Sequence, residues 1–587
     1  MNLDEKRKKR LASEYGETWN PVKGGVRVAL VYPNSYSVGM SNLGFQAIYH
    51  ILNQRDDVTC ERVFLPDREG REKAETREDL CRSFPSGRLL RTFDILAFSV
   101  SFELDYVHLV EILQKNKIPP LRSQREYGRD PMVWIGGVAL SINPEPLADF
   151  ADVMFIGEAE EMIQEAMDAI AGNPVRDREG FKLFSRACLG LEGVYFPHAY
   201  AFDYDSLGRV DRVEHDPDFP QRIRRRWIRD LDRMPTVSRV MTPDTELNDM
   251  FLVELDRGCG RHCRFCAAGY IYRPPRFRSL DGVMRSVREG LSHTDRIGLV
   301  GAAVSDYPRM SELVREIRSC GARISVSSLR ADSLTPELMS ALAESGHKTI
   351  SLAPEGGSQR MREIINKGIE EKDILNACRM ALGYRILNLR LYFMVGLPSE
   401  ETVDIEAIAD LVLKIREIQK QAGREQGRIG RITVSLNSFV PKPHTPFQWF
   451  PMNKKDALAK KIGYIKKRLH QKGNITVIQD LPKWSVIQGL LSRGDRRVSS
   501  LLVSVVSGGG NWAQALKESG EVLAGSPFRE RERDEIFPWD IVEPGCRRDY
   551  LYQEYQRSAS GRLTPACPED LACHRCGVCG ESEERHG

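Results

Sequence analysis

Short apolar strands alternate with amphipathic helices near the start of the chain. Strands that are apolar on both faces, with helices between them, indicate a parallel sheet covered on both sides. We therefore predict an α/β fold that begins with an arm (1–24) and a doubly wound, Rossmann-like domain (25–175). The strand candidates are VRVALVY (26–32), VTCERVFL (58–65), DILAFSV (94–100), PMVWIGG (131–137) and DVMFIG (152–157).

A second alternating series begins at Phe251, after a charged, aromatic-rich stretch (176–245) that we interpret as a connector with short strands. Six strand and helix units follow one another, which predicts an open, partial (β/α)6 barrel over 246–450, with its chemistry at the carboxyl ends of the strands. The strand candidates are FLVELDRG (251–258), RIGLVGAAV (296–304), RISVSSL (323–329), KTISLAPE (348–355), NLRLYFMVG (388–396) and RITVSLNSFV (431–440).

A mixed, mainly helical region (451–557) and a cysteine-rich tail (558–587) close the chain of 587 residues. Its net charge of +3 is too balanced to indicate a nucleic-acid or membrane partner. The start is charged, and no stretch approaches the roughly 18 apolar residues of a membrane span, so we predict a cytoplasmic protein. Cysteines stay reduced there, and clustered ones are interpreted first as metal ligands.

Three cysteines crowd onto one turn after the first barrel strand: Cys259, Cys263 and Cys266 form a C-x3-C-x2-C loop. Three thiolates leave one iron of a 4Fe-4S cubane open, and an open iron can bind a further molecule as well as pass an electron. The alternative is a zinc site. Zinc would need a fourth ligand from His262 inside the same loop, which is sterically awkward.

This loop strongly resembles the signature of the radical S-adenosylmethionine (SAM) superfamily, and further segments at successive strand ends match it. The resemblance implies that Phe265 packs near the adenine of SAM and that Gly301 and Ala302 meet its methionine amino group. The acidic end usual in that glycine-rich segment is replaced here by VSD (304–306). It also implies SAM contacts at the following residues: Ser327, Arg330, Glu355 and Gly396.

Radical SAM chemistry implies that the bound cluster splits SAM reductively to a 5′-deoxyadenosyl radical, with the protein orienting the reactants. The resemblance thus predicts an enzyme that receives electrons from a flavodoxin or ferredoxin. Its substrate is not identified, and an RNA or ribosome-related substrate is one candidate. The competing hypothesis is a non-catalytic iron-sulfur electron carrier or sensor, although such a protein gains nothing from an open iron.

The N-terminal domain resembles the cobalamin-binding domains of cobalamin-dependent radical SAM enzymes, which implies a methyl transfer. A ligand would lie at the carboxyl strand ends, where the candidates are Ser99, Ser101, Gly136 and Gly137. The chain lacks the D-x-H-x-x-G motif, and His108 lies in a helical pattern. Binding without a histidine ligand and a domain that has lost the cofactor are therefore both open.

A methylthiotransferase-like modifier is a further alternative. It requires three N-terminal cysteines around a second cluster, but Cys60, Cys81 and Cys188 are far apart in the sequence. The tail has a denser group, with C-x2-C-x2-C spacing in its last three cysteines. This spacing predicts a second metal site, either a ferredoxin-like 4Fe-4S cluster or a zinc knuckle with His574 in reserve. The tail ligands would be Cys567, Cys573, Cys576 and Cys579.

Overall fold

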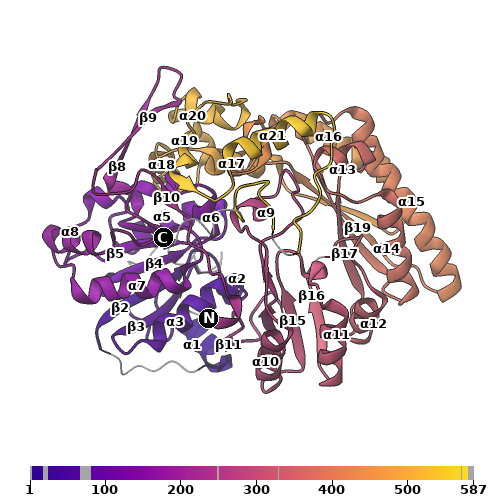
Figure 1. Ribbon diagram of the computed structural model, residues 1–587, viewed down its shortest axis with the longest axis horizontal. Coiled ribbons are helices and arrows are strands. Elements are labelled where there is room, and N and C mark those ends of the chain that lie inside the picture. Colours follow the sequence, from indigo (N-terminus) through magenta and orange to yellow (C-terminus); the bar gives the residue numbers. More distant parts are fainter. Residues whose placement is uncertain are drawn as a thin grey trace.

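Two α/β units lie side by side in the computed structural model, and the C-terminal helices lie across both (Figure 1). The structure describes residues 3–17, 24–66, 81–247, 250–327, 329–569 and 572–579. The predicted α/β fold class, with a doubly wound N-terminal domain and a partial barrel, is confirmed. The domain boundaries given above stay predictions.

The N-terminal unit is built on a six-stranded sheet in the order β3-β2-β4-β5-β6-β7. All five predicted strands form and pair in parallel, and β7 adds antiparallel at the edge. The order reverses between β2 and β4, so this is the point at which a doubly wound sheet opens a crevice for a ligand. The strands are β2 (Val26–Tyr32), β3 (Val58–Phe64), β4 (Ile95–Ser99), β5 (Met132–Gly136), β6 (Val153–Phe155) and β7 (Val194–Tyr195).

Successive residues of β2 belong to different cores, because neighbouring side chains of a strand point to opposite faces. Val28 and Leu30 belong to a cluster with residues of α3, α7 and α8, whereas Ala29 and Val31 belong to a second cluster with residues of α5 and of the distant helix α18 (Val498–Ser507). The continuous apolar run in the sequence is thereby explained. The covering helices are α2 (Tyr36–Met40), α3 (Leu43–Gln54), α5 (Tyr106–Lys115), α6 (Val138–Ile142), α7 (Ala159–Gly172) and α8 (Arg178–Ala187).

The second unit is an open barrel of two parallel sheets, β12-β15-β16 and β17-β18-β19-β20, joined by a parallel bridge between Leu329 and Leu352. All six predicted strands form. A seventh, β20, was not predicted, because it is short and half-exposed. The strands are β12 (Phe251–Glu254), β15 (Arg296–Val300), β16 (Arg323–Val326), β17 (Thr349–Glu355), β18 (Asn388–Val395), β19 (Ile432–Ser438) and β20 (Ile475–Gln479).

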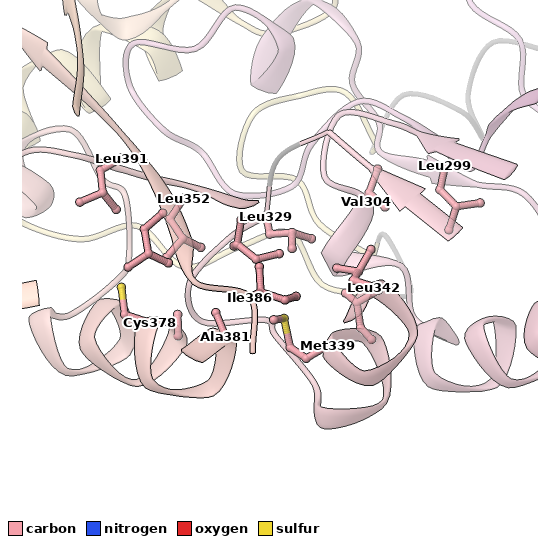
Figure 2. Close-up of a cluster of buried hydrophobic side chains, with 14 of the residues drawn as sticks. Leu299, Val304, Leu329, Met339, Leu342, Leu352, Cys378, Ala381, Ile386 and Leu391 are labelled. Carbon is pink, nitrogen blue, oxygen red and sulfur yellow. The ribbon is translucent and has the colours of Figure 1, made fainter. Parts of the chain in front are cut away.

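The barrel core lies between these strands and the helices outside them. Figure 2 shows strand residues such as Leu352 and Leu391 facing helix residues such as Ala381 and Cys378, which is a core thiol. The helices begin where the sequence provides caps: Ser279 accepts from Gly282 N–H, and Thr335 precedes Pro336. They are α10 (Leu280–Leu291), α11 (Met310–Ser319), α12 (Pro336–Glu344), α13 (Gln359–Ile364), α14 (Glu371–Gly383), α15 (Thr402–Gln426) and α16 (Lys455–Leu469).

The C-terminal helices pack on the N-terminal unit and, at α21, around a small buried cluster that includes Trp539, Tyr550 and Leu551. Residues of α17 and α18 complete the N-terminal hydrophobic cluster, and Arg496 forms an ion pair of 2.7 Å with the fully buried Glu145. None of the helices among the described residues is long and apolar enough to cross a bilayer. The helices are α17 (Pro482–Arg493), α18 (Val498–Ser507), α19 (Trp512–Glu518), α20 (Glu521–Gly525) and α21 (Arg548–Ala559).

Candidate active site at the cysteine loop

The three-cysteine loop lies between β13 (Asp256–Arg257) and α9 (Ala268–Ile271), after the first barrel strand as predicted. Cys266 N–H donates to Cys263 O at 3.1 Å, and Gly269 N–H donates to Cys266 O at 3.1 Å. These turns keep the three thiols close enough for Cys263 and Cys266 to act electrostatically on Cys259. Local hydrogen-bonded turns therefore bring the three thiols together.

A buried guanidinium fixes the loop to the barrel. Arg264 has no exposed side-chain surface and donates to Glu363 O at 3.0 Å and Ile364 O at 2.9 Å. Its ion-pair partner is Glu554 of α21, at 3.1 Å and equally buried. Because a buried charge needs both a counter-ion and hydrogen bonds, this arrangement ties the loop to one position.

No three His, Cys, Asp or Glu side chains within the described ranges converge on a point as the ligands of a single ion would. The thiolates of a 4Fe-4S cluster bind to separate irons and surround a cubane instead. His262 does not turn towards the loop thiols. Its Nε2 lies 3.3 Å from Sγ of Cys567 in the tail. His262 therefore contacts the tail and does not serve as a fourth ligand in the loop.

A cavity of about 620 Å³ lies between the two α/β units. Its N-terminal wall includes Ser99, Ser101, Gly136 and Gly137, the four residues predicted at the carboxyl strand ends. Its barrel wall includes the ends of β12 and β15 and the segment that follows β16. This cavity is therefore continuous from the crevice of the doubly wound sheet to the mouth of the barrel.

The barrel wall holds a carboxylate that sequence analysis missed. Asp256 is buried, its Oδ1 accepts from Ala302 N–H at 2.8 Å, and its Oδ2 has no hydrogen-bond partner among the described residues. A Cβ at Gly301 would lie 2.1 Å from Oδ2, so glycine is required for this close approach. Burial, with a smaller contribution from the nearby Glu254 and Asp306, raises the pKa of Asp256 to about 7. The sequence feature that could have identified Asp256 is an acidic residue at the end of an apolar strand.

Three of the seven predicted SAM contacts, Gly301, Ala302 and Ser327, line the cavity. Phe265 packs instead against a separate apolar cluster that contains Met394 and Phe439.

The other three predicted contacts make internal bonds. Arg330 forms a two-pronged pair with Asp332 at 3.0 Å and lies near Cys263. Glu355 lies 3.8 Å from Lys367, and burial raises its pKa. Gly396 donates to Glu400. Their contacts with SAM stay predictions.

Buried ion pairs couple the two walls of the cavity. Glu158, after β6, pairs with Arg257 at 3.1 Å and Arg276 at 2.5 Å, and Arg257 also pairs with Glu160 at 2.5 Å. All four side chains are at most 11% exposed. Removing one partner from such a network leaves an unpaired charge, so the network holds the units in register.

His108 is not a cavity residue: its Nδ1 lies 3.0 Å from Pro33 O and 3.2 Å from Asp105. The three N-terminal cysteines do not form one group either. Cys60 and Cys188 belong to one hydrophobic cluster, and Cys81 belongs to the cluster on the other face of the sheet. The structure therefore does not favour a methylthiotransferase-like cluster.

The four tail cysteines lie near one another, since Cys567, Cys573 and Cys576 all act electrostatically on Cys579. A further cysteine was missed: the buried Cys546 lies beside Cys576, within reach of a hydrogen bond. It is remote from the tail in the sequence, so only the fold reveals it.

Family models agree with this geometry. The model for the N-terminal region of radical SAM proteins matches residues 44–197, and that for the radical SAM superfamily matches residues 253–412. The chain belongs to the radical SAM superfamily and is a radical SAM enzyme, a class that uses a 4Fe-4S cluster and SAM.

Relatives span the chain to different extents. The uncharacterized protein MJ0966 of Methanocaldococcus jannaschii is 31% identical over 81% of this chain and 90% of its own length. The ribosomal protein uS12 methylthiotransferase RimO of Thermotoga maritima is 26% identical over 44% of this chain and 63% of its own. A structure of TsrM, a radical SAM methyltransferase from Kitasatospora setae with cobalamin and a [4Fe-4S] cluster bound, is 13% identical, with a TM-score of 0.49, over 86% of this chain and 99% of that one.

Proposed function

We propose that the chain cleaves SAM at a 4Fe-4S cluster held by Cys259, Cys263 and Cys266, and that a cobalamin in the N-terminal domain takes part in a methyl transfer. The observation that carries this proposal is a cavity lined by both units. Gly258 and Ala268, which flank the cysteine loop in the sequence, are among its lining residues. When bound, the cluster supplies the electron that breaks the bond between the SAM sulfur and C5′. The protein binds, orients and shields the reactants.

The residues at the barrel wall suit the amino end of SAM. The free Oδ2 of Asp256 is a buried acceptor that a cationic ammonium would satisfy, and the charge pairing would offset the cost of burying both groups. Asp256 thereby replaces the acid that the VSD segment (304–306) lacks at the usual place. Ser327 adds a hydroxyl on the same wall.

The N-terminal wall suits a flat, amide-rimmed macrocycle. Gly136 and Gly137 add no side chain to this wall, and Ser99 and Ser101 add polar groups. Because His108 is bonded to Pro33 and Asp105, these residues would hold cobalamin without a histidine ligand to the cobalt. These features support an N-terminal domain that binds cobalamin over one that has lost the cofactor.

Reducing equivalents would come from a flavodoxin- or ferredoxin-type partner, and an RNA or ribosome-related substrate stays a prediction. RimO is named for its action on ribosomal protein uS12, but the chain matches only 63% of it. The electron-carrier alternative loses support, because Asp256 and the cavity provide for a bound molecule that such a protein does not need.

The test is anaerobic incubation of the reconstituted full chain with dithionite, SAM and hydroxocobalamin, followed by quantification of 5′-deoxyadenosine and S-adenosylhomocysteine. We expect both products, together with a change in the absorption spectrum of the bound cobalamin. Gly136→Val, which adds a side chain to the cavity wall, should abolish the spectral change. Gly172→Val on α7, with open space around it, is the matched control. Neither product forming while the cluster is intact would contradict the proposal.

A further inference from the structure

The tail is bonded to the backbone of the cysteine loop. Cys567 N–H donates to Gly260 O at 2.9 Å, directly beside the first loop cysteine. Asn366 bridges the two segments, because its Nδ2 donates to His262 O and Thr564 O, each at 3.1 Å, and its Oδ1 accepts from Thr564 N–H at 2.8 Å. In Figure 1 the yellow C-terminal segment accordingly passes through the middle of the molecule near α9.

Buried charges reinforce this docking. Glu554 has no exposed side-chain surface and accepts from Arg264 of the loop and from Thr564 Oγ1 of the tail, the latter at 2.7 Å. Arg264 also donates to Arg562 O at 2.5 Å. One buried ion pair thus holds the cysteine loop and the start of the tail together.

His262 connects the two cysteine groups directly. It lies between Cys259 and Cys263 in the sequence, is 2% exposed and has a φ of +58°. Arg273 Nη2 lies 2.7 Å from Nδ1 and can only donate. Nδ1 is therefore an acceptor, so the neutral ring carries its proton on Nε2, which lies 3.3 Å from Cys567 Sγ. The loop thus donates a hydrogen bond to a sulfur of the tail.

The rest of the tail folds around its own thiols. Arg547 N–H donates to Cys576 O at 2.9 Å, and Gly577 turns back over Arg547 with a φ of +90°. A Cβ at Gly577 would lie 2.7 Å from Arg547 Cγ, so a side chain would push the turn away. The segment that precedes α21 is therefore the platform on which the tail thiols are gathered.

We propose that Cys567, Cys573, Cys576 and Cys579 hold a second iron-sulfur cluster, which passes single electrons to the loop cluster across the contact between Cys567 and His262. An external carrier of the ferredoxin or flavodoxin class would lose one electron, which would pass by way of the tail cluster to the loop cluster, and no bond would be made or broken. The receiving end of this relay rests on the proposed function. The ferredoxin-like spacing favours iron over zinc, and hydrogen bonds to cluster sulfurs tune the potential.

His262 is a positioning residue in this account, since it acts on the tail cluster through Cys567. His262→Asn keeps a side chain that tolerates positive φ but is too short to reach Sγ. Because a hydrogen bond to a thiolate stabilises the reduced cluster, its loss should shift the midpoint potential of the tail cluster to a more negative value. An unchanged potential in a redox titration followed by electron paramagnetic resonance would remove His262 from the relay.

The main test is the metal content of the anaerobically reconstituted full chain. We expect about eight irons, about eight sulfides and no zinc for two cubanes, and about four irons in Cys573→Ala/Cys576→Ala. Cys320→Ala, at an exposed thiol after α11, is the matched control and should keep about eight. About four irons with one zinc in the wild type would overturn the proposal.

The same double variant separates this inference from the proposed function. If its remaining cluster still changes its spectrum with SAM, the loop site stands whether or not the tail binds iron. If the wild type holds two clusters and neither responds to SAM, the second centre stands and the proposed function fails. Since the wild-type metal count is decisive by itself, poor folding of the variant leaves the inference testable.

Discussion

The thiols of the cysteine loop are gathered by local chain geometry, whereas those of the tail are gathered by docking onto distant segments. Cys263 and Cys266 share one hydrogen-bonded turn. Cys567 and Cys576 are instead held by Gly260 and Arg547. A site within one turn should therefore survive changes elsewhere, while a site assembled by docking should fail when its docking contacts are removed.

The largest expected effect comes from breaking the loop. Cys263→Ala removes one of three thiolates, so 5′-deoxyadenosine formation should fall to the background level in an anaerobic assay with dithionite and SAM. Because the tail thiols are gathered separately, the variant should keep the tail metal. Cys320→Ala should match the wild type, and normal product formation by Cys263→Ala would show that the loop does not hold the catalytic cluster.

Breaking the docking should remove the tail metal, whereas the local turns still gather the three loop thiols. Glu554→Ala leaves Arg264 buried without its counter-ion, which should lower the free energy of unfolding by about 3–5 kcal/mol in urea denaturation. The tail metal should be lost with it. Asp203→Ala, which removes an exposed partner of Arg212, is the control and should cost at most about 1 kcal/mol. Equal losses in the two variants would refute the docking role of Glu554.

Protein stability and SAM affinity, measured as functions of pH, test the role of Asp256 beside the cysteine loop. The pKa of Asp256 is about 7 and lies above its ordinary value, so the free protein holds a proton there that the unfolded chain releases. This group should make the free protein less stable as pH rises from about 4 to 7. Binding of the SAM ammonium needs the ionised form, so affinity should fall about tenfold per pH unit below 7. The facing groups are Glu254 and Asp306.

The control for this series is Asp256→Asn, which should bind SAM weakly at every pH and show no such slope. Calorimetric titration with SAM between pH 5.5 and 8 measures both. A wild-type affinity that does not vary with pH would show that Asp256 is not the partner of the ammonium.

The smallest effect is expected at Cys546, which lies beside Cys576 without belonging to the proposed four ligands. Cys546→Ala should keep about eight irons and change only the spectrum of the tail cluster. Loss of about four irons would show that Cys546 is a ligand of the tail cluster. One more ligand of that cluster would then come from a segment outside the tail.

The sequence predicts what is local and misses what only tertiary contact creates. The apolar runs from Val26 and Phe251 identify both sheets, and the spacing around Cys263 identifies the loop, because each pattern lies within one short segment. The half-exposed strand β20 has too weak a pattern to stand out. The carboxylate of Asp256 and the thiol of Cys546 become parts of sites only through neighbours far along the chain.

The most direct test of the account is Mössbauer spectroscopy of the full chain reconstituted with 57Fe, recorded with and without SAM. We expect SAM to change the signal of one iron in the loop cluster, the iron without a protein thiolate, and we expect Cys263→Ala to lose this change. A loop that binds zinc, or a cubane whose irons all stay the same when SAM is added, would contradict it.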